Sequence, residues 1–187
     1  MKFALGKKSG MTTIYNDEGA QNVTLVTIAP NVIEMIRTEE KDGYNAVCLS
    51  IDKTKKKKFL REFRVDDVKD FKEKEKIFID IFEIGDKVNV SATTKAKGFQ
   101  GVVKRHGFAG GPATHGHRHV LRAPGSIGSA YPQHVLKGRK MAGRMGGTRS
   151  TVRNLTVVAI DKENNIIALK GAVPGVAGRI VEIVSVG

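Results

Sequence analysis

Short runs of β-branched and other apolar residues, bounded by Gly, Pro or polar positions, dominate both ends of the chain. The amino-terminal part contains four such runs, at residues 23–29, 44–51, 77–84 and 87–90. The carboxy-terminal part contains three more, at residues 155–160, 166–169 and 179–186. Val, Ile and Thr favour strands, and a polar break such as 161–165 between two runs is typical of a hairpin. Strands at short intervals predict an all-β protein, built as a barrel or a sandwich.

One charged stretch interrupts this pattern. Residues 65–76 are dense in charge of both signs, with Asp66, Asp67 and Asp70 ahead of Lys72, Lys74 and Lys76. That order suits the dipole of a helix, whose amino end attracts negative charge. The pattern therefore predicts a short solvated helix, within a small charged insertion at about residues 60–77.

The strand pattern also fades in the middle of the chain, between residues 95 and 153. Apolar residues are sparse there and Gly recurs every few positions. Such a segment buries too little apolar surface to offset the entropy of its own ordering. We therefore expect residues 95–153 to form an extended, mostly irregular central extension from a β domain made of residues 1–94 and 154–187.

The distribution of charge sharpens this division. No acidic residue occurs from Lys87 to Ile160, a segment that holds 13 of the 32 Lys and Arg residues, all five His and 12 of the 21 Gly. The formal net charge of +13 is confined to this block, because basic and acidic residues balance in the rest of the chain. Like charges repel, so the block predicts a polyanionic partner, which we expect to be nucleic acid. Lys and Arg would contact phosphates, and the scarcity of aromatic residues favours folded RNA over an open single strand.

The same block suggests two alternative chemistries. His115, His117 and His119 alternate, so an extended backbone would place three imidazoles on one face, as a zinc site requires. No carboxylate lies nearby to orient them, and we predict no metal and no cofactor, with a metal-dependent binding module as an alternative. Residues 138–147 resemble a phosphate loop but lack its Gly-Lys-Ser/Thr ending. We predict no enzymatic activity and no small-molecule substrate; the runner-up, an RNA-modifying enzyme, would need a cofactor fold and a catalytic constellation.

The sequence also bears on the compartment. The single cysteine, Cys48, allows no intramolecular disulfide, which fits a reducing environment. The first eight residues lack the apolar stretch of a signal peptide, and no apolar run approaches the ~20 residues that span a membrane. We expect an intracellular soluble protein with no membrane partner.

Six long strings, in the same order as in the family, resemble the universal ribosomal protein L3 (uL3) family of the bacterial or organellar type. They lie at Gly6–Thr12, Asp42–Val47, Lys97–Phe108, Arg122–Gly128, Lys137–Gly146 and Lys170–Gly175. The resemblance covers the whole chain. His106 departs from the family pattern, because many bacterial members have tryptophan there. Gln133 does not align with a glutamine that some members methylate, so we do not expect that modification here.

The resemblance implies a closed β-barrel of the type shared with translation factors, and a structural role in the large ribosomal subunit. It implies direct binding to 23S-type rRNA near its 3′ end, early in subunit assembly, with the extension reaching toward the peptidyl transferase centre. The implied neighbours include proteins uL14 and bL19, on a cytoplasmic ribosome or, alternatively, an organellar one. The rRNA-contacting set carried over by motif is Lys95, Lys97, Lys104, Arg105, His106, Arg118, His119, Arg122, Lys137, Arg139, Lys140, Arg144 and Arg149.

Overall fold

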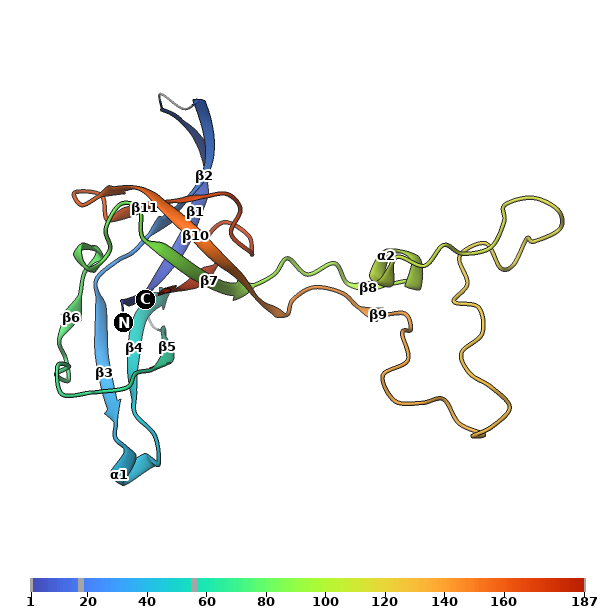
Figure 1. Ribbon diagram of the computed structural model, residues 1–187, viewed down its shortest axis with the longest axis horizontal. Coiled ribbons are helices and arrows are strands. Elements are labelled where there is room, and N and C mark those ends of the chain that lie inside the picture. Colours follow the sequence, from blue (N-terminus) through green and yellow to red (C-terminus); the bar gives the residue numbers. More distant parts are fainter. Residues whose placement is uncertain (1, 17–18, 55–56, 187) are drawn as a thin grey trace. The chain divides into compact units, whose positions relative to one another are not determined.

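The structure is a computed structural model that describes residues 2–16, 19–54 and 57–186 (Figure 1). It is mostly β-structure, as predicted. The chain divides into two compact units, which we call unit 1 (residues 1–94 and 149–187) and unit 2 (residues 95–148). Among the described residues, no helix is long and apolar enough to cross a bilayer.

Six antiparallel strands of unit 1 form a closed ring of hydrogen bonds, in the order β1-β12-β7-β10-β11-β2 and back to β1. Their bounds are β1 Phe3–Asn16, β2 Gly19–Thr27, β7 Lys87–Thr93, β10 Arg149–Asp161, β11 Ile166–Lys170 and β12 Ile180–Ser185. Strand β1 closes the ring by changing partners along its length. Residues 3–7 pair with β12, and from Lys7 onward the strand pairs with β2.

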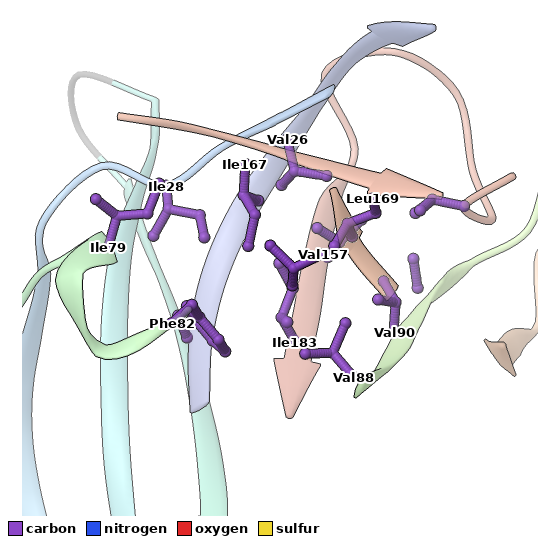
Figure 2. Close-up of a cluster of buried hydrophobic side chains, with 14 residues drawn as sticks. Val26, Ile28, Ile79, Phe82, Val88, Val90, Val157, Ile167, Leu169 and Ile183 are labelled. Carbon is purple, nitrogen blue, oxygen red and sulfur yellow. The ribbon is translucent and has the colours of Figure 1, made fainter. Parts of the chain in front are cut away.

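The side chains that point into this ring form the first of two hydrophobic cores. Figure 2 shows this cluster, in which Val88 and Val90 of β7 face aliphatic side chains from β2, β10, β11 and β12. The short 3-10 helix η1 (Ile79–Ile81) adds Ile79, and Phe82 follows it into the same cluster. Complete burial of one such aliphatic or aromatic side chain contributes about 1.5–3 kcal/mol. The ring is therefore stabilised by a continuous apolar interior.

Unit 1 also contains a second sheet, with strand order β5-β4-β3-β6. Its strands are β3 Asn31–Arg37, β4 Ala46–Thr54, β5 Lys57–Arg64 and β6 Lys76–Ile77, and helix α1 (Glu39–Asp42) follows β3. A second core joins this sheet to β1, and its aromatic rings Phe3 and Phe63 stack with centroids 4.8 Å apart. The free thiol of Cys48 is buried on β4, and burial raises its pKa.

The predicted helix within residues 60–77 is wrong. β5 continues to Arg64, and turns and irregular backbone lead from there to β6. Val65, Phe71 and Ile77 all pack against the second core, and side chains six residues apart cannot share one face of a helix. Asp67 also accepts the backbone N–H of Lys69 at 3.1 Å, a local bond that competes with helix formation.

Most of the predicted strands are present in the structure, and one is not. Those at 23–29, 44–51, 87–90, 155–160, 166–169 and 179–186 are confirmed in substance, with shifted ends. The run at 77–84 is not a strand beyond Ile77, because the chain turns into η1 so that Ile79 and Phe82 enter the first core. β1, β3 and β5 were not predicted.

Unit 2 has little regular structure. It contains a two-residue ladder between β8 (Phe99–Gln100) and β9 (Gly143–Arg144), and helix α2 (Val102–His106). Within residues 95–148, all of which are described, Val102 is the only buried residue. Unit 2 therefore has no hydrophobic core of its own.

Candidate RNA-binding surface

Twelve of the thirteen predicted rRNA-contacting residues lie in unit 2, and Arg149 lies in unit 1 at the start of β10. Within unit 2, all of the predicted residues are exposed except Arg105 and His106, which are half-buried. The unit contains ten Lys and Arg side chains and no acidic one. Its electrostatic potential is therefore set by cations that no carboxylate of the same unit offsets.

Backbone pairing holds the two ends of unit 2 side by side. The Lys97 N–H donates to the Met145 carbonyl at 2.9 Å, and the Met145 N–H donates to the Gly98 carbonyl at 2.9 Å. The β8–β9 register then sets Phe99 opposite Arg144. Gly146 allows the close approach of the two segments, because a Cβ at this position would lie 2.1 Å from the Lys95 carbonyl oxygen. Lys95, Lys97 and Arg144 are brought together in this way.

Two of the predicted contact residues form hydrogen bonds within unit 2. The Arg105 guanidinium Nη1 donates to the Met141 carbonyl at 2.5 Å, and the same carbonyl lies 3.0 Å from Nε2 of His106. Both side chains come from helix α2, so the helix is fastened to the returning segment before β9. The sequence predicts that both residues contact RNA, and the structure adds a contact of each within the protein.

Arg139 forms a third contact of this kind. Its Nη2 donates to the Ser126 carbonyl at 2.7 Å, which ties two irregular segments of unit 2 together. By contrast, the side chains of eight cations form no hydrogen bond or ion pair with any residue of the described chain. These are Lys95, Lys97, Lys104, Arg118, Arg122, Lys137, Lys140 and Arg144. Their charges are available to an external anion.

Exposed apolar side chains lie among these cations. Phe99 is 77% exposed, Tyr131 is 79% exposed and Leu136 is 62% exposed. The predicted rRNA-contacting set does not include them. An aromatic residue in a segment that has no core of its own could have indicated a contact with a partner. Rings of this kind can stack on a nucleobase while neighbouring cations hold phosphates.

The three alternating histidines are not extended. His115, His117 and His119 lie in a turn region, and His115 has a φ of 57°. Alternation along a strand therefore does not apply to them. Among the described residues, no group of three or more His, Cys, Asp or Glu is placed to hold a metal ion.

Arg149 differs from the other predicted contacts. It pairs with Thr93 of β7 in the ring, and its guanidinium forms an ion pair with the Glu182 carboxylate of β12. The ladder between β10 and β7 begins at this residue, although residues 149–153 were expected to belong to the extension. The structure thus places Arg149 on the wall of the ring.

Comparisons with known proteins identify the family of the chain. Residues 58–171 match the family model of ribosomal protein L3. The chain is 44% identical to the large ribosomal subunit protein uL3 of Herpetosiphon aurantiacus, over 96% of this chain and 93% of that protein. It is 45% identical to the uL3 protein of Desulforapulum autotrophicum, over 97% of both chains, and 42% identical to that of Alkaliphilus metalliredigens, over 94% and 92%. The chain belongs to the ribosomal protein L3 family.

Proposed function

We propose that this protein is a structural constituent of the large ribosomal subunit and that unit 2 binds 23S-type rRNA directly. The observation that carries the proposal is the combination of ten cations, no carboxylate and no hydrophobic core within residues 95–148. A segment of this kind gains order by packing against a partner, and a polyanion supplies the opposite charge.

The chemistry of the contact follows from the side chains that unit 2 leaves unengaged. Arg144 can bind a phosphate through two parallel N–H groups, and Lys137 and Lys140 act as point charges on flexible stems. Arg105, His106 and Arg139 have a different part, because they hold the backbone in shape through carbonyl contacts. We therefore divide the predicted set into cations that meet RNA and residues that shape the segment.

The finer parts of the proposal rest on the family resemblance. Unit 1 would be a closed barrel of the type shared with translation factors, and unit 2 would be the extension that reaches toward the peptidyl transferase centre. Binding would occur early in assembly, near the 3′ end of the rRNA, with uL14 and bL19 as neighbours. The protein would work on the cytoplasmic ribosome, or on an organellar one, without catalysing a reaction.

The experiment measures binding of the full chain to a 23S-type rRNA transcript at several salt concentrations. The variant K137Q/K140Q/R144Q removes three unit 2 charges whose side chains bond to no other residue that the structure describes. The control K69Q/K162Q/K170Q removes the same charge from exposed positions of unit 1. Each lost phosphate contact lowers the slope of log K against log salt by about 0.7–0.9, so we expect a decrease of about 2–3 for the first variant only. Equal slopes for the wild type and both variants would contradict the proposal.

A further inference from the structure

Unit 1 contains a groove whose charge the sequence does not reveal. It has a volume of about 380 Å³, and five basic side chains and one carboxylate line it. The charged lining residues are Lys7, Lys53, Arg61, Arg149, Arg179 and Glu182. We call this feature the basic groove. Four of its cations come from the part of the chain outside residues 87–160, where basic and acidic residues balance, and Arg149 comes from inside that segment. These cations are far apart in the sequence, so only the fold brings them together.

The single carboxylate of the groove is already engaged by two of the five cations. Glu182 is buried, with the Arg61 Nε 2.7 Å from its Oε1 and the Arg149 guanidinium against its Oε2. Arg61 comes from β5 of the second sheet and Arg149 comes from β10 of the ring. One buried charge thus fixes two guanidinium groups at the meeting of two sheets. A carboxylate with two such partners cannot neutralise the rest of the groove.

The other three cations of the groove differ from Arg61 and Arg149 in their pairing. Lys7, Lys53 and Arg179 form no ion pair with any acidic residue in the ranges that the structure describes. Three positive charges gathered in one concavity repel each other, and low-dielectric walls strengthen their joint field. The arrangement therefore favours an anion.

The wall that carries Arg179 is held firmly in position. The Gly178 N–H donates to the Lys8 carbonyl at 2.7 Å, and the Lys8 N–H donates to the Arg179 carbonyl at 2.9 Å. The Lys8 ammonium also donates to the Val173 carbonyl at 2.7 Å, so that the preceding loop is tied to β1. The backbone at Arg179 is thus preorganised while its side chain stays exposed.

We propose that the basic groove binds a phosphodiester of the RNA backbone, and so forms a second RNA contact separate from unit 2. Phe59 and Ile180, both half-buried, give the groove an apolar wall against which a ribose or base can pack. The Arg61 and Arg149 guanidiniums, oriented by Glu182, present N–H donors, and Lys7, Lys53 and Arg179 supply the excess charge. This inference rests on the proposed function for its choice of RNA as the polyanion.

The test compares three full-length variants for binding to the 23S-type rRNA transcript. K7Q/K53Q/R179Q removes the three groove cations that are not paired with Glu182, and K137Q/K140Q/R144Q removes three unit 2 cations. K69Q/K162Q/K170Q is the matched control, with the same loss of charge elsewhere on unit 1. We expect the groove variant to lower the slope of log K against log salt by about 2–3. In hydroxyl-radical footprinting, we also expect it to lose protection at a set of rRNA backbone positions that stay protected with the unit 2 variant.

A groove variant that matches the control in salt slope and in protected rRNA positions would overturn the inference. A lower slope in the unit 2 variant of the same experiment would still support the proposed function. Loss in the groove variant alone would support the groove and contradict the role of unit 2. If the wild-type protein does not bind the transcript, both proposals fail. The single substitution Arg179→Gln, at an exposed side chain, provides a folded alternative and should lower the slope by about 0.7–0.9. If inorganic phosphate binds the groove at millimolar concentration and the groove variants bind rRNA as the wild type does, the groove is a site for a free anion instead.

Discussion

At the scale of single residues, Asn31 links the two sheets of unit 1. Its buried side chain accepts the Leu5 N–H through Oδ1 at 2.5 Å and donates through Nδ2 to the Leu5 carbonyl at 3.0 Å and the Ala29 carbonyl at 2.6 Å. The amide therefore satisfies both backbone groups of Leu5 on β1, as a neighbouring strand would. Satisfying buried backbone groups in this way is a requirement that apolar packing alone does not meet.

We expect Asn31→Ala to lower the free energy of unfolding by about 2–5 kcal/mol, because it leaves buried N–H and C=O groups without a partner. Urea unfolding followed by circular dichroism measures the change. Asn22→Ala is the control, because the Asn22 side chain is exposed and its Oδ1 accepts the Thr13 hydroxyl in a solvent-exposed bond. The control should stay within about 0.5 kcal/mol of the wild type. An equally small change for Asn31→Ala would contradict the bridging role.

The family resemblance supplied the residues of the predicted rRNA-contacting set, and the long segment without acidic residues pointed to the same part of the chain. The sequence could not separate Lys140, whose charge is unengaged, from Arg139, which donates to the Ser126 carbonyl. It also missed Lys7 and Arg179, because their proximity depends on strand pairing between β1 and β12 and on the loop before β12. Residue type was predictable, whereas the partner of each side chain was set by tertiary contacts.

At the scale of elements, unit 2 depends on a short ladder rather than on packing. Gly146 has a φ of +71°, and an added Cβ would lie 2.1 Å from the Lys95 carbonyl oxygen. We expect Gly146→Ala to separate the paired ends, because the backbone cannot move without breaking the bonds between residues 97–98 and 145. Amide exchange of Lys97 and Met145 should become at least tenfold faster, as measured by NMR or mass spectrometry.

Gly128→Ala is the matched control for this prediction, because an added Cβ there meets no atom within 4 Å. It should leave the exchange of both amides unchanged. Unchanged exchange in Gly146→Ala as well would show that the ladder does not depend on the close approach at this position.

The elements that sequence reasoning found were those with uninterrupted β-branched runs, such as β2 and β11. It missed β1 because Gly6 and Gly10, with two lysines between them, mask the strand. Gly6 is needed where β1 meets β2, since a Cβ there would lie 2.5 Å from Cγ1 of Val26. It predicted a helix at 65–76 because the charge order suits a helix dipole, but Phe71 is drawn to Phe3 in the second core, with ring centroids 5.7 Å apart. Burial of scattered apolar residues outweighed the local charge pattern.

At the scale of the whole molecule, stability should decrease in acid. The pKa of Asp86 is lowered, first by the backbone N–H of Glu83 and then by the Lys2 ammonium, and the pKa values of Glu34 and Glu62 are lowered by basic hydrogen-bond partners. A carboxylate whose pKa is lower in the folded state stabilises the fold above its unfolded pKa. That contribution is lost as the pH falls from about 4 through the folded pKa values.

We therefore expect the urea midpoint to be steady from pH 7 to 5 and to fall between pH 4 and 2. The variant D86N should show a smaller fall than the wild type, because one of the titrating groups is absent. Added salt should weaken the effect, since these groups are near the surface. A urea midpoint that rises on acidification from pH 5 to 3 would contradict this account.

The two units differ in what stabilises them and in their charge. Unit 1 has two cores and a closed ring of strands, whereas unit 2 has cations and one buried valine. The central claim is that unit 2 lies against large-subunit rRNA. Crosslinking of intact ribosomes followed by mass spectrometry tests it most directly. We predict crosslinks from peptides within residues 95–148 to 23S-type rRNA; ribosomes in which peptides of unit 1 crosslink to rRNA and those of unit 2 do not would contradict the claim.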